Sequence, residues 1–178
     1  MVYLFPGHSE QCFGAIRDGV VKEFNLANCL CKKISDHLTR MKVDHFYKAI
    51  DGKTQKEYLD KRIEFTNENQ KFFDHNLFID LHFNAHPVTK ANGSEVYYWK
   101  DGKDAALVVS QALGKHFRDR GAKVGNFKVL RETDVPAILI EVCFMSNDDD
   151  MKVLSRKRSV IAKDIATAIA NYMESLAI

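Results

Sequence analysis

Residues 137–144 have the sequence AILIEVCF, a continuous apolar run interrupted by one glutamate. A run of this length and β-branched content is typical of a strand that is covered on both faces of a parallel sheet. A second run, LFIDLHF at residues 77–83, carries Asp80 and His82. We therefore expect two strands, of which the 137–144 strand is buried on both sides, and each carries polar groups toward its C-terminal end.

Shorter segments on either side of these two runs alternate between strand-like and helix-like patterns. Further strands are predicted at residues 2–5, 43–47, 94–99 and 127–130. Helices are predicted at residues 20–41, 57–74, 105–120 and 149–176, with Gly121 ending the third and a break near Ser155 in the fourth. Strands that alternate with long helices are typical of the α/β class, with an open, mostly parallel sheet and helices on both faces.

The composition indicates one globular domain over residues 1–178, since 46% of the residues are hydrophobic and 28% are charged. The net charge of +2 disfavours nucleic acid as the main partner. No apolar run approaches the ~20 residues of a membrane-spanning helix, so we expect no membrane insertion. The N-terminus shows no signal peptide, and the four cysteines lack a Cys-x-x-Cys spacing. We therefore expect free thiols, and either synthesis in the cytoplasm or a chain that lacks its export signal.

Two glutamates occupy positions where the pattern calls for apolar side chains. Glu23 lies on the apolar stripe of the first helix, in line with Ala27, Leu30 and Ile34, and Glu141 lies inside the 137–144 run. A carboxylate that faces the interior is costly unless it is paired, protonated or bound to a metal. Taken alone, Glu23 could equally be favoured by the helix dipole, and Glu141 could pair with a basic side chain.

Two histidines occur at the ends of predicted strands. His8 follows the first strand, and His82 ends the 77–83 strand on the same face as Asp80. Each alone could be an ordinary hydrogen-bonded or exposed histidine. The C-terminal ends of parallel strands meet at one edge, where ligands collect. Two imidazoles, one carboxylate and an open position form a hydrolytic zinc site, and the second glutamate would then be a general base.

Other assignments remain open from the residues. The spacing His82-x-x-x-His86 would bind zinc on a helix, but Pro87 and the preceding strand argue against a helix there. Asn84 is a candidate for substrate binding or for support of the metal site, or is a turn residue. Arg131 could contact a peptide carboxylate or form a surface ion pair. A binding module without activity on the same fold and a zinc peptidase are the rival functions, whereas a nucleotide-binding domain lacks its glycine motif.

The sequence resembles the zinc-dependent N-acetylmuramoyl-L-alanine amidases, which are cell-wall hydrolases of bacteria and their phages. The resemblance covers nearly the whole chain in five ordered motifs: Gly7-His8, Gly19-x-x-x-Glu23, Arg62-x-x-x-x-Asn67, His82-x-Asn84-Ala85, and Val129-Leu130-Arg131 followed by residues 135–147. Residues 93–98 are also close to a family strand. Two departures are Asp80, where many relatives carry serine, and residues 46–54, which lack the usual Thr-Arg pair.

The resemblance implies a twisted sheet of about six strands and one zinc ion held by His8, Glu23 and His82, with Glu141 as the catalytic carboxylate. It further implies peptidoglycan as the substrate, cleaved between the lactyl group of N-acetylmuramic acid and L-alanine at the bacterial cell wall. With neither an export signal nor a cell-wall-binding module visible, the chain is expected to be the catalytic part of a phage endolysin or an autolysin, acting as a monomer.

Overall fold

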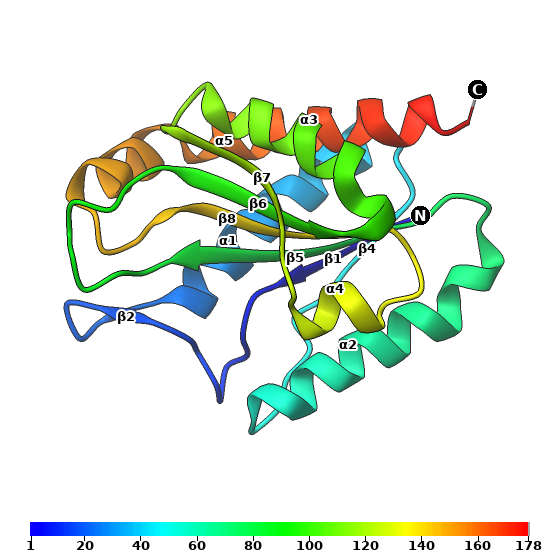
Figure 1. Cartoon of the computed structure of the whole chain (residues 1–178), viewed down its shortest axis with the longest axis horizontal. Coiled ribbons are helices and arrows are strands. Elements are labelled where there is room, and N and C mark those ends of the chain that lie inside the picture. The colour runs from blue at the N-terminus through cyan, green and yellow to red at the C-terminus, as the bar shows by residue number, and fades with distance from the viewer. Residues whose placement is uncertain (178) are drawn as a thin grey trace.

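The computed structural model describes residues 1–177 and shows a six-stranded sheet with the strand order β4-β1-β5-β8-β6-β7 (Figure 1). The strands are β1 (Val2–Pro6), β4 (His45–Tyr47), β5 (Leu77–Asn84), β6 (Ser94–Trp99), β7 (Asp119–Val124) and β8 (Ala137–Phe144). Strands β4, β1, β5 and β8 are parallel, whereas β6 is antiparallel to β8 and parallel to β7. The prediction of a mostly parallel α/β sheet is confirmed.

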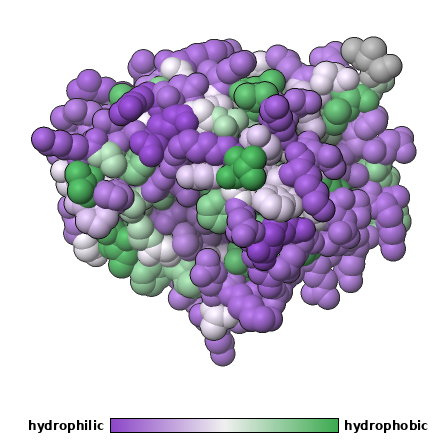
Figure 2. Space-filling view, in the orientation of Figure 1, coloured by the Kyte–Doolittle hydropathy of each residue, from purple (hydrophilic) through white to green (hydrophobic). Residues whose placement is uncertain are grey.

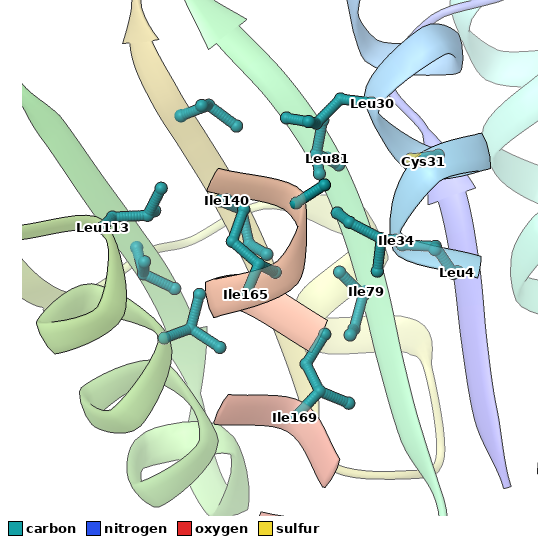
Figure 3. Packing of buried hydrophobic residues seen from close by; sticks show 14 of the residues in the cluster. Leu4, Leu30, Cys31, Ile34, Ile79, Leu81, Leu113, Ile140, Ile165 and Ile169 are labelled. Atoms are coloured by element: carbon teal, nitrogen blue, oxygen red, sulfur yellow. The ribbon is translucent and has the colours of Figure 1, made fainter. Parts of the chain in front are cut away.

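Three long helices cover one face of the sheet: α1 (Glu23–Arg40), α3 (Lys103–Gly114) and α5 (Asp148–Ser175) (Figure 1). The alternate residues of β5 and β8 that face these helices are aliphatic and fully buried. Figure 3 shows Ile79, Leu81 and Ile140 from the sheet packed against Ile34 of α1 and Ile165 of α5. This cluster is the main hydrophobic core, and burial of such side chains contributes about 1.5–3 kcal/mol each.

The opposite face is covered by α2 (Gln55–Asn69) and the short α4 (Lys128–Glu132), and it holds a smaller aromatic core. Tyr3, Phe5 and Phe78 lie there, beneath Ile63 of α2 and Val129 of α4. The side chains of Asp80, His82 and Asn84 have the same parity as Phe78, so they also belong to this face. The functional end of the sheet is therefore built under α2 and α4.

The predicted strand at residues 127–130 is wrong, because those residues enter α4, and the sixth strand is β7 at Asp119–Val124. Strand β7 is an edge strand, paired only with β6 and largely half-exposed. Its sequence, DRGAKV, therefore lacks both an apolar run and clear alternation, and the helix predicted to reach Arg120 ends instead at Gly114. Val129 and Leu130 are adjacent and both buried, which one turn of helix allows.

Two further boundaries differ from the sequence-based expectation. Helix α5 is continuous through Ser155, whose exposed hydroxyl donates to the carbonyl of Lys152 without interrupting the helix. The first helix starts at Glu23, not at Val20, because the preceding residues form a small antiparallel pair, β2 (Ile16–Arg17) and β3 (Val21–Lys22). The remaining short elements are the 3₁₀ turns Gln70–Phe72 and Lys100–Gly102.

The surface is mainly hydrophilic on the face seen in Figure 2, with small apolar groups scattered over it, several of them near the end where β2 lies in Figure 1. Cys31 and Cys143 are buried and Cys12 and Cys29 are half-buried, and all four are free thiols, as expected. Within residues 1–177, none of the helices combines the length and the apolar character that crossing a bilayer requires.

Candidate metal centre and catalytic site

The first imidazole belongs to His8, which lies in the loop that follows β1. The Gly7 amide donates to the carbonyl of Leu81, which fixes the loop to β5. A Cβ on Gly7 would lie 2.5 Å from ring atoms of His82, so glycine is needed for this close approach. His8 itself has a positive φ of 65°, a conformation that is uncommon outside glycine. The backbone is therefore shaped to bring the His8 and His82 rings together, with centroids 4.9 Å apart.

Glu23 opens α1 and projects between the two histidines. Its Oε2 lies 3.0 Å from His8 Nε2, and its Oε1 lies 2.9 Å from His82 Nδ1. The same two oxygens accept hydrogen bonds from the backbone amides of Ala15 and Phe83. Gly14, with a φ of +72°, passes so close that a Cβ would lie 2.4 Å from the His8 ring. The β2–β3 pair and this glycine thus set the start of the helix.

Burial acts against ionisation of Glu23, but its hydrogen bonds and charge interactions with His8 and His82 outweigh the effect of burial. As a result, the pKa of the Glu23 carboxyl is held below its ordinary value of 4.5. Its side chain is 6% exposed, against 18% for His8 and 13% for His82. The carboxylate is therefore ionised and faces inward, while the two imidazoles border the open side.

His8, Glu23 and His82 each offer one ligand atom, and these atoms lie within 4.8 Å of one another. Two imidazole nitrogens and one carboxylate oxygen are the donor set of catalytic zinc sites, which leave a fourth position for water or substrate. The glycine cradles at residues 7 and 14 keep side chains away from these donors. The residues present therefore fit a divalent metal ion.

Glu141 lies beside this triad, because it is the β-register partner of His82. On its other side, its partner in β6 is Glu95, which accepts from Asn84, Arg120 and Lys123. The Glu141 Oε2 atom has no hydrogen-bond partner among the described residues. Burial, with Glu23 and Glu95 adding repulsion against the attraction of His82, raises the pKa of the Glu141 carboxyl to about 8. A buried acid with a raised pKa next to a cluster that could hold a metal ion is a candidate general base.

The four predicted residues line one cavity of about 470 Å³ under α2 and α4. Tyr58 and Leu59 of α2 form one wall, and Asn126, Phe127 and Lys128 form another. The two walls are linked, since Lys128 forms an ion pair with Asp60 of α2. The cavity thus combines walls of mixed apolar and polar character with a polar floor, which suits a substrate that carries both amide and apolar groups.

The two remaining candidates are separated by the fold. Asn84 lines the cavity, and its side-chain amide donates to Glu95 over 2.8 Å. Arg131 instead belongs to a neighbouring depression with Trp99, and its guanidinium donates to Asn126 and contacts Glu132. His86, the partner in the rival zinc spacing, lies exposed beyond β5, where its Nδ1 accepts from the Val88 amide. His86 is therefore not part of the triad.

A buried arginine, Arg62, supports the site, although its residue type and position in the sequence do not by themselves indicate this role. Arg62 of α2 is 0% exposed, and its Nη1 donates to Asp80 Oδ1 over 2.9 Å. Its Nη2 donates to the carbonyl of His8. In the sequence, Arg62 is distinguished only by its place in the Arg62-x-x-x-x-Asn67 motif, because the charged residues around it predict an exposed side chain.

An α/β sheet that carries a His-Glu-His cluster and an adjacent buried glutamate is typical of metal-dependent hydrolases. The family model described as N-acetylmuramoyl-L-alanine amidase matches residues 2–171. The chain therefore belongs to the N-acetylmuramoyl-L-alanine amidase family, as the sequence motifs indicate.

Individual relatives agree in sequence and in structure. The chain is 31% identical over 144 residues to "Probable cell wall amidase LytH" of Staphylococcus epidermidis, covering 72% of this chain and 50% of that protein. It is 29% identical over 177 residues to "N-acetylmuramoyl-L-alanine amidase LytC" of Bacillus subtilis, covering 94% of this chain and 34% of that protein. The chain thus spans about half of the first relative and about a third of the second. The catalytic domain of the CD27L endolysin, which targets Clostridia difficile, superposes with a TM-score of 0.84, 28% identity and 96% coverage of both chains.

Proposed function

We propose that residues 1–178 form a zinc-dependent catalytic domain that hydrolyses the amide between the lactyl group of N-acetylmuramic acid and L-alanine in peptidoglycan. The observation that carries the proposal is the placement of Glu141 beside the His8–Glu23–His82 triad in one cavity. Family membership supports the choice of bond. The donor set supports zinc as the metal.

His8, Glu23 and His82 would hold the ion. Bound there, zinc would supply Lewis acidity that polarises the scissile carbonyl and acidifies water. Glu141 takes the proton of the attacking water and delivers it to the leaving nitrogen of L-alanine. With a cation held by the triad, the pKa of the Glu141 carboxyl would fall from its metal-free value of about 8, and the carboxylate would be available at neutral pH.

The remaining cavity residues would position the substrate. Tyr58 and Phe127 offer apolar walls for the sugar and the stem peptide, and the side-chain amide of Asn84 donates to Glu95 beside the catalytic carboxylate. Burial opposes this ionisation, but Lys123 and Arg120 keep the pKa of the Glu95 carboxyl below its usual value. Glu95 therefore remains charged and helps to retain the proton on Glu141 after transfer.

The site of action that follows is the bacterial cell wall. LytH and LytC are named as a cell-wall amidase and an N-acetylmuramoyl-L-alanine amidase, and the structural relative is an endolysin domain. We extend the same role to this chain, as the catalytic part of an endolysin or an autolysin that works as a monomer.

Digestion of purified cell walls tests this function. The expected products are new L-alanine amino groups without new reducing sugar ends. Amino groups from another residue would instead support a zinc peptidase, and wall binding without any product would support a binding module. Treatment with a chelator should abolish the reaction, and added zinc should restore it.

A further inference from the structure

We propose that Asp80, held in place by Arg62, is a positioning residue that sets the orientation and the ligating form of His82. This inference rests on the proposed metal site and extends it to a residue outside the ligand set. Asp80 lies two residues before His82 on the same face of β5, where both side chains point under α2.

The His82 ring lies between two carboxylates. Its Nδ1 is 2.9 Å from Glu23 Oε1, and its Nε2 is 3.2 Å from Asp80 Oδ2. A neutral imidazole has one N–H donor and one free lone pair, and a ligating nitrogen must present the lone pair. Nδ1 is the nitrogen on the side of the triad, so the hydrogen belongs on Nε2. Asp80 is an acceptor at that position and therefore favours the ligating tautomer.

Arg62 prevents Asp80 from turning away. Its Nη1 donates to Asp80 Oδ1, which leaves Oδ2 directed at the His82 ring. Oδ2 is buried, and no described residue satisfies it with a well-aligned hydrogen bond, so it is available to Nε2. Arg62 also donates to the backbone carbonyl of His8 and stacks over the Tyr58 ring, 4.7 Å from its centroid. The Arg62 guanidinium thus holds both Asp80, which contacts the His82 ring, and the backbone of His8.

The surroundings of Asp80 argue against a purely structural ion pair. Its register partners on the two neighbouring strands are Phe5 and Leu139, which are apolar. A buried ion pair in such a place is commonly no more stabilising than an apolar pair of similar volume. Oδ2 lies against the ring of His82, a proposed metal ligand, and orientation of this ligand accounts for the pair.

The test is the zinc affinity of Asp80→Asn, measured by competition with a chromogenic chelator. The Asn oxygen can still accept from Arg62, but the amide then turns an NH₂ group toward Nε2, which favours the other tautomer. Loss of such an outer-shell carboxylate typically weakens metal affinity by about 10- to 100-fold. The visible spectrum of the cobalt-loaded protein should shift as well, because the ring orientation changes.

Two additional variants separate this role from a loss of folding. The double variant Arg62→Gln with Asp80→Asn leaves no unpaired buried charge, and it should fold and still show the weakened affinity. Asp150→Asn is the matched control, since this buried acid accepts from the backbone amides of Gly93 and Phe144 and contacts no proposed ligand. Its zinc affinity should equal that of the unaltered protein.

The outcomes are distinct. Weaker zinc binding in both Asp80 variants, with the control unchanged, supports the inference. An unchanged dissociation constant in either folded Asp80 variant overturns it, as does equal weakening in the Asp150→Asn control. If the unaltered protein itself binds no zinc, the proposed metal site fails, and this inference fails with it.

Discussion

Replacement of Glu141 by glutamine removes the proposed base and nearly preserves its shape. The Glu141 Oε2 atom has no hydrogen-bond partner among the described residues, so the change breaks no network there. The three proposed metal ligands lie on other elements and keep their contacts with one another. We therefore expect zinc to remain bound while turnover falls.

The size of the loss of turnover follows from the proposed role of Glu141 as general base. A positioned general base contributes typically 10²- to 10⁴-fold to the rate, which corresponds to about 3–5 kcal/mol of activation free energy. Glu141→Asp withdraws the carboxylate by one methylene, and a misplacement of about 1 Å can cost on the order of 10²-fold. The order of activity should be the unaltered protein, then Glu141→Asp, then Glu141→Gln.

The same substitution has a pH signature in the metal-free protein. The pKa of Glu141 is raised to about 8 from 4.5, so between these pH values the folded protein holds a proton that the unfolded chain has lost. The free energy of unfolding therefore falls as the pH rises across this window. Glutamine does not titrate, so Glu141→Gln should match the unaltered protein near pH 4.5 and exceed its stability near pH 8, by about 1.4 kcal/mol for each unit of pKa shift.

Cell-wall digestion with the zinc-loaded variants and urea unfolding of the metal-free variants at both pH values measure these effects. Glu64→Gln is the control, because Glu64 is exposed on α2. Near-normal turnover of Glu141→Gln with full zinc content would refute the role as base. Parallel pH dependences of stability for the two proteins would refute the buried, raised-pKa state.

Three further outcomes are expected. His8→Ala should lose zinc and activity together, as measured by metal analysis, and retention of both would remove His8 from the ligand set. Zinc binding near pH 7 should release about one proton or more, because Asp80 and Glu23 outweigh burial and raise the pKa of His82 in the metal-free protein. Calorimetry in buffers of different ionisation enthalpy measures this proton release. A binding enthalpy that does not depend on the buffer would contradict it. Arg17→Ala should speed backbone hydrogen exchange in residues 15–22, because the Arg17 side chain links the β2–β3 pair to the carbonyl of Met145 and to Asp148 by hydrogen bonds. Unchanged exchange would show that these hydrogen bonds do not order the segment.

The central strands and the gathering of polar residues could be predicted because both follow from local rules. The runs around Ile79 and Ile140 are apolar on both faces of β5 and β8, and parallel strands bring their C-terminal ends to one edge. Glu23 and Glu141 stood out because each interrupts an apolar pattern. These features sufficed to place His8 and His82 beside them.

Other parts depend on contacts that a single segment does not reveal. Strand β7 pairs on one side only, so residues such as Arg120 and Lys123 replace the apolar pattern of a buried strand. Arg62 lies among charged residues in α2, and its burial depends on distant partners, since its guanidinium donates to Asp80 and to the His8 carbonyl. The proposed role of Asp80 likewise depends on the three-dimensional structure, which places the His82 ring between the carboxylates of Glu23 and Asp80.

A crystal structure of the zinc-loaded protein, with anomalous diffraction data collected at the zinc edge, tests the proposed metal site directly. We expect one strong peak at bonding distance, about 2.0–2.2 Å, from His8, Glu23 and His82, with the Glu141 carboxylate facing it but not bound. A peak at other side chains, or the absence of any peak from a fully folded, zinc-soaked crystal, would contradict it.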